Sequence, residues 1–151
     1  MNDSLFDELK SELYKIQRDN STLRQELASS EEKFAAATRD IFKDIVTVLD
    51  AFERTKKVIS EKELDSTEEA QKVRDRFLNV EKTLKNKLAN LGVQEIDLKP
   101  GDMSDSNLCA ISDTEPDDTK PNDMILSVDK KGYLYKGDVI IRPAEVVIVK
   151  N

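Results

Sequence analysis

The chain has 151 residues, of which 36% are charged and only 5% are aromatic, and its formal net charge is −7. An acidic chain without a basic stripe excludes nucleic acid and an anionic membrane surface as partners. It contains no histidine, which removes the commonest general base and zinc ligand. We therefore expect no enzyme activity, no cofactor and no metal.

The N-terminal sequence MNDSLFDELK has neither the basic nor the apolar segment of a secretory signal. The longest apolar run, residues 146–149, is far too short to span a bilayer. The single cysteine, Cys109, has no partner for an intrachain disulfide, and we expect it to be a small half-buried residue, not a reactive thiol. These features predict a soluble protein of the cytoplasm.

Residues 1–44 are predicted to form a long coiled-coil helix. Apolar residues from Phe6 onward recur at alternating spacings of three and four, and no single helix buries so narrow a stripe. Asn20 lies at an a position, where paired amides favour a parallel dimer, although a seam can also merely tolerate such a residue. The predicted dimer-interface residues are Leu13, Ile16, Asn20, Leu23, Leu27, Phe34, Ile41, Val48, Phe52, Phe77 and Leu84.

Residues 45–91 are predicted to form a helical hairpin. The heptad spacing breaks after Ile41 and the apolar face widens, which indicates that more helices join here. The polar run 61–69 predicts a loop with a helix N-cap at Ser66 or Thr67, and Gly92 is a natural residue after the second helix. Two such hairpins in a dimer would form a four-helix bundle.

Residues 92–151 are predicted to form a small all-β domain, so the fold class is α+β. Strands are expected at 93–98, near 108–112, and at 124–128, 133–135, 138–142 and 144–150. Lys136-Gly137 is predicted to be a two-residue hairpin loop in which the glycine supplies one positive φ. Because so short a segment has a marginal core, we expect it to lean on the helices.

The last two strands combine a buried segment with a break. Residues 146–149 are apolar on both faces, which predicts a buried strand. Pro143 removes a ladder donor and therefore belongs at an edge or a bulge. Arg142 is then expected to be presented on an edge strand to a carboxylate or carbonyl of a partner, the alternative being a solvated strand end.

Three further stretches occur in order: VLDAFER at residues 48–54, VEKTLK with LGVQEI within residues 80–96, and KGY with RPAEV within residues 131–146. Taken together, they resemble the GrpE family of nucleotide exchange factors for DnaK-type chaperones. Each motif alone is weak, but the ordered set covers about residues 40–150. The sequence departs from the family pattern at Cys109, Asn79 and Thr47, where histidine, glycine and proline are usual.

The resemblance implies a homodimer that binds the ATPase domain of a DnaK-type chaperone and accelerates ADP release by favouring the open nucleotide cleft. Arg54 and Glu53 could equally form an ordinary charged helix face. The residues alone favour turn and core packing for Tyr133, Asn107 and Leu108. The alternative function is a non-catalytic coiled-coil tether with a protein-docking β domain. The partner-binding residues that the resemblance implies are Arg142, Pro143, Ala144, Arg54, Glu53, Tyr133, Asn107 and Leu108.

Overall fold

The computed structural model describes residues 2–151, with side chains from residue 4 onward. Within these residues two helices, α1 (Asn2–Glu61) and α2 (Glu68–Asn90), are followed by six strands, so the predicted α+β fold is confirmed. The chain divides into two compact units, Met1–Thr38 and Arg39–Asn151, and helix α1 contributes to both. Within the described residues, neither helix has the length and apolar character needed to cross a membrane.

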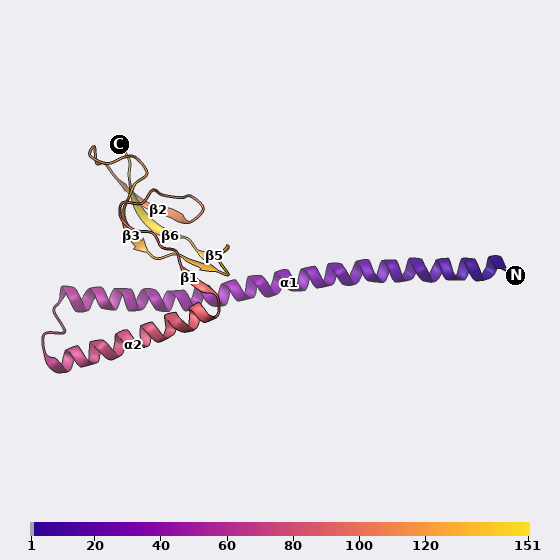
Figure 1. Ribbon diagram of the computed structural model, residues 1–151, viewed down its shortest axis with the longest axis horizontal. Helices are drawn as coiled ribbons and strands as arrows, with labels where there is room; N and C mark the ends of the chain where they lie inside the picture. Colours follow the sequence, from indigo (N-terminus) through magenta and orange to yellow (C-terminus); the bar gives the residue numbers. More distant parts are fainter. Residues whose placement is uncertain (1) are drawn as a thin grey trace. The chain divides into compact units, whose positions relative to one another are not determined.

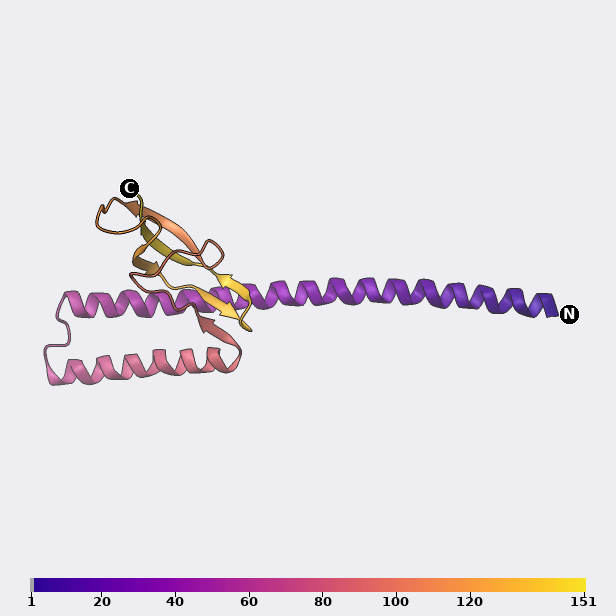
Figure 2. The ribbon, with the colours of Figure 1, turned by 45° about the horizontal axis from the view of Figure 1, so that its top comes forward.

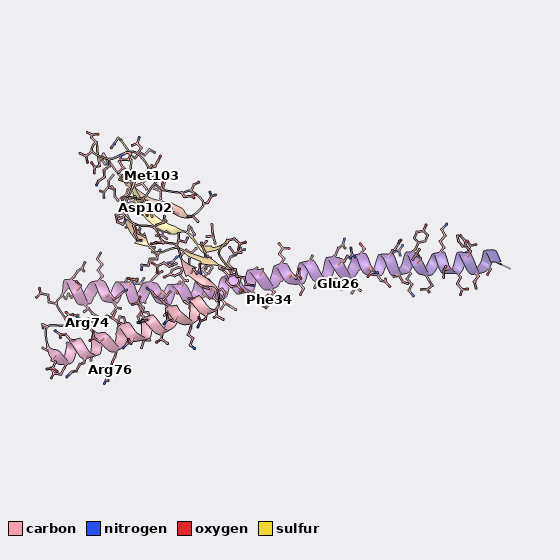
Figure 3. All side chains as sticks on the ribbon, in the orientation of Figure 1. Glu26, Phe34, Arg74, Arg76, Asp102 and Met103 are labelled. Atoms are coloured by element: carbon pink, nitrogen blue, oxygen red, sulfur yellow. The ribbon has the colours of Figure 1, made fainter. Side chains whose placement is uncertain are left out.

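The first unit consists of the N-terminal part of α1. From residue 4 to residue 38 every side chain is exposed except that of Thr38, which is half-buried. The predicted seam shares this exposure: Leu13 is 55% and Phe34 is 75% accessible. Figure 3 labels Phe34 and Glu26 among the side chains of this unit. This exposure fits an apolar stripe that packs on another helix, and the dimer remains a prediction.

The second unit begins with the helical hairpin, in which the C-terminal part of α1 and α2 run side by side in both views (Figures 1 and 2). The rings of Phe52 and Phe77 lie 4.7 Å apart between the helices. Of the two candidate caps, Thr67 is the N-cap of α2, and its hydroxyl accepts a hydrogen bond from the Ala70 N–H at 3.2 Å. Gly92 follows the end of α2 with a φ of +88°, as its position predicts.

The strands form two three-stranded sheets. One has the order β1 (Val93–Glu95), β4 (Tyr133–Tyr135), β5 (Val139–Arg142), and all its pairs are antiparallel. The other has the order β2 (Cys109–Glu115), β6 (Ala144–Val149), β3 (Ile125–Lys130), in which β2 runs parallel to β6. The predicted strand 93–98 is therefore shorter than expected, and the strand near 108–112 is longer.

The loop between β4 and β5 differs from the prediction. Tyr135 pairs with Val139, so three residues intervene where two were expected. Both Lys136 and Gly137 have positive φ, +53° and +87°. Because lysine seldom adopts this conformation, the longer loop was not predicted from the sequence.

Strand β6 is the centre of its sheet, and the prediction of a buried last strand is confirmed. Val146 and Val149 are fully buried, and the two residues between them are at most 8% exposed. Because β2 and β3 pair with its two edges, the backbone N–H and C=O groups of this apolar strand are not available to pair with another chain.

Two apolar clusters form the core of the second unit. The first contains residues of both helices and of the sheet β1-β4-β5, so this sheet packs against the helices as predicted. Burial of an aliphatic side chain such as Val46 or Leu49 contributes about 1.5–3 kcal/mol. The members of the first cluster are Phe42, Val46, Leu49, Leu88, Val93, Tyr133 and Ile141; those of the second are Cys109, Ile125, Ala144, Val146 and Ile148.

Candidate protein-binding surface

Arg142 is the last residue of β5, an edge strand, as the neighbouring proline predicts. Its guanidinium nevertheless turns toward α1 and donates to both carboxylate oxygens of Asp50, at 2.6 and 2.8 Å. A third bond, of 2.7 Å, runs from Nη2 to the Lys131 carbonyl. The side chains of Arg142 and Asp50 are each only 13% exposed. The expectation that this arginine is presented outward on the edge is therefore wrong.

The surroundings of Arg142 fix its charge. Hydrogen bonding to Asp50 raises the pKa of the guanidinium above its ordinary value. The Tyr133 ring lies 5.8 Å from the guanidinium carbon, within cation–π range. Burial raises the pKa of the Tyr133 hydroxyl, which therefore stays neutral in the ordinary pH range. The charged guanidinium therefore lies between the Asp50 carboxylate and an uncharged aromatic ring.

Glu53, one turn further along α1, lies among three lysines. Its carboxylate is 2.9 Å from Lys56, 3.4 Å from Lys131 and 3.5 Å from Lys85. Burial raises the pKa of Glu53, but the hydrogen bond to Lys56 and the charges of Lys131, Lys56 and Lys85 outweigh this and hold it below its ordinary value. Lys131 also binds Glu95 of β1 at 2.8 Å. Glu53 thus belongs to a network that spans both helices and the β strands, not to an ordinary solvated helix face.

Arg54 lies beside this network but stays exposed, and it has no ion-pair partner among the described residues. It lines an open cleft of about 790 Å³ between α1 and β3. Lys57 on α1 and Lys130 on β3 line the same cleft. Among the predicted residues, this arginine is therefore the cation most accessible to a partner.

The remaining predicted residues mostly shape the backbone. Ala144 is 1% exposed, and its N–H donates to the Leu108 carbonyl at 3.0 Å, so the first residue of β6 is held against the loop before β2. Pro143 lies between β5 and β6 and is half-buried. Asn107 is exposed, and its backbone and side-chain N–H groups donate to one carboxylate oxygen of Asp105 at 2.8 and 3.0 Å. The expected packing and turn roles therefore fit Leu108, Tyr133 and Asn107.

Sequence reasoning missed Asp50 as the partner of Arg142, and it missed Lys131 as the link between α1 and β1. The available signal was Asp50 itself, an acid placed between the apolar Leu49 and the half-buried Phe52 on the face of α1 that packs inward. In residues 4–151 no group of three His, Cys, Asp or Glu side chains is arranged to hold a metal ion.

A helical hairpin that carries two small sheets, with charged groups arranged as ion pairs at their junction, defines an α+β protein. A sequence model of the GrpE family matches residues 3–150. Because the match spans nearly the whole chain, the chain belongs to the GrpE family, whose members are non-enzymatic co-chaperones of DnaK-type chaperones. The resemblance found in the sequence is thereby confirmed. None of the curated proteins compared with the chain matches it.

Proposed function

We propose that this protein binds the ATPase domain of a DnaK-type chaperone and accelerates ADP release by favouring the open nucleotide cleft. The observation that carries the proposal is the family match over residues 3–150. The mechanism is a shift of population, because a protein that binds the open state better than the closed state must raise the open fraction. Moving a closed population to a mostly open one takes about 5 kcal/mol of differential affinity.

We propose that the cleft between α1 and β3 is part of the binding surface. Arg54 and Lys57 line it and are exposed, so both can pair with carboxylates of the chaperone. Residues 92–151 carry a net charge of −5 and would face basic side chains. In this arrangement Glu53 lines the cleft, and Asn107 holds an exposed turn. The roles of Tyr133, Leu108, Pro143 and Ala144 are to support the fold of the β strands.

We propose that the protein acts as a cytoplasmic homodimer. The residues of the predicted seam support this, because Leu23 and Leu27 are 61% and 60% exposed in the single chain. On α2, Val73 and Val80 are similarly exposed, as a bundle with a second hairpin requires. Sedimentation equilibrium is expected to give a dimer, and a monomer at micromolar concentration would contradict the assignment of the seam.

The test of the function is release of fluorescent ADP from the ATPase domain of the cognate chaperone, measured by stopped flow. Added protein is expected to raise the release rate until it saturates. Arg54→Ala should raise the half-saturating concentration, whereas Lys72→Ala, at an exposed ion pair within α2, should leave it unchanged. If the protein binds the chaperone but the release rate stays constant, the tether function with its docking β domain replaces nucleotide exchange.

A further inference from the structure

The contact between Asp50 and Arg142 joins two parts of the second unit that are 92 residues apart in sequence. It is bidentate, and the same guanidinium also holds the Lys131 carbonyl. A planar fork that meets two carboxylate oxygens and a carbonyl permits essentially one orientation of the strand that carries it. The contact therefore specifies direction as well as proximity.

The other contacts between α1 and the strands are less directional. The apolar cluster around Leu49 and Tyr133 is held by burial, which has no preferred angle. The ion pair of Lys131 with Glu53 is 3.4 Å long, and both side chains are about a third exposed (36% and 34%), so it constrains little. Among the described residues, Asp50 and Arg142 thus form the buried directional contact between the helix and the β strands.

A direct contact of Arg142 with a partner would require the guanidinium to leave Asp50. Asp50, whose side chain is only 13% exposed in the pair, would then lose its cation. The buried Nε of Arg142 has no hydrogen-bond partner within residues 4–151, and it lies inside the molecule, out of reach of a partner. The geometry thus disfavours Arg142 as a contact residue.

We propose that Asp50 is a positioning residue, and that its ion pair with Arg142 sets the orientation of the β strands on α1 and thereby the maximal rate of ADP release. This rests on the proposed exchange function. A misoriented β region leaves the exposed cations of α1, Arg54 and Lys57, in place to bind the chaperone, but it stabilises the open nucleotide cleft less well. Loss of the pair therefore lowers the maximal rate and leaves the half-saturating concentration nearly unchanged.

The test compares Asp50→Asn, Arg142→Lys and the double variant in the ADP-release assay. Each single variant is expected to lower the maximal rate about tenfold, which corresponds to about 1.4 kcal/mol less stabilisation of the open nucleotide cleft. The double variant should be no worse than either single variant, since both remove the same contact. Asp44→Asn is the matched control, because Asp44 is an exposed acid of the same helix, and its rate should equal that of the unaltered protein.

The charge exchange Asp50→Arg with Arg142→Asp should restore part of the rate, which simple loss of folding would not permit. Hydrogen exchange gives a readout without the chaperone: β5 amides should exchange faster in Asp50→Asn and Arg142→Lys, while the amides of α2 are unaffected. If Asp50→Asn unfolds the β strands, the positioning role is judged from the maximal rate of Arg142→Lys, which keeps the positive charge.

Two results would overturn the proposal. Variants that bind more weakly at an unchanged maximal rate would make Arg142 a contact residue. Variants that match the unaltered protein in both parameters would leave the ion pair without a role in exchange. If the unaltered protein itself fails to accelerate ADP release, the proposed exchange function is refuted. The positioning role is tested separately: it is refuted if the β5 amides of the variants exchange at the same rate as those of the unaltered protein.

Discussion

Gly132, in the turn between β3 and β4, offers the sharpest test of packing in the β strands. A Cβ added there would lie 2.5 Å from the backbone nitrogen of Ala144, 2.7 Å from Cδ1 of Ile96 and 3.0 Å from Cα of Ala144. Two of these three atoms are backbone, so side-chain rotation relieves only the contact with Ile96. Gly132→Ala therefore forces the start of β6 away from the loop that precedes β4.

The cost follows from this geometry. Overpacking a close-packed core costs about 1–3 kcal/mol, and the upper end applies where backbone has to move. We expect Gly132→Ala to lower the free energy of unfolding by about 3 kcal/mol, and the melting temperature by about 12 °C at roughly 4 °C per kcal/mol. The matched control is Gly137→Ala, which has open space around the added Cβ but a φ of +87°. That control should lose only about 1 kcal/mol, from the left-handed backbone.

The assay is urea unfolding of the full chain followed by tyrosine fluorescence, since two of the three tyrosines lie in β4. Gly132→Ala should shift the β-strand transition to lower urea, well beyond the shift of Gly137→Ala. Equal shifts for the two variants would refute the reasoning, because only Gly132 is closely packed.

Three further outcomes test the helices. Thr67→Ala removes the N-cap bond to Ala70 and should destabilise the hairpin by about 1 kcal/mol in thermal unfolding, whereas Ser66→Ala should not; equal effects would contradict the cap assignment. Asn20→Leu should raise the melting temperature of the long helix while loosening its choice of oligomer, and a lower melting temperature would argue against the seam position. Burial raises the pKa of Glu81, but its bonds to Lys85 and Lys56 outweigh this and leave that pKa lowered from 4.5. The stabilisation from Glu81 is therefore present above about pH 4.5 and is lost as the pH falls below it. Glu81→Gln should lower the free energy of unfolding by about 2 kcal/mol at neutral pH and should weaken the fall of that free energy at acid pH. An unchanged fall at acid pH would contradict this.

The features predicted from the sequence are those that depend on neighbours along the chain. The cap at Ser66 or Thr67, which the structure places at Thr67, the stop at Gly92 and the buried strand at residues 146–149 each follow from local backbone preference or local apolar pattern. The order of the sheets and the parallel pairing of β2 with β6 depend on contacts between distant segments, for which one sequence offers no periodic signal.

The candidate surface shows the same division. Pro143 correctly indicated an edge, because a missing N–H is a backbone property that the sequence states directly. The direction of the Arg142 side chain was not predicted, because its partner lies 92 residues away and is one of many acids on a charged helix. The exposed Arg54 was predicted, but the cleft around it requires α1 and β3 to meet in space.

The central claim is that the protein binds the open nucleotide cleft better than the closed one. By linkage, ADP must then weaken binding of this protein to the ATPase domain by the same factor by which the protein weakens ADP binding. The direct measurement is the Kd of the protein for the ATPase domain, by calorimetry, without nucleotide and with saturating ADP. We predict a higher Kd in ADP, matched by an equal rise in the Kd of ADP when the protein saturates the domain. An identical Kd in both conditions would contradict the claim.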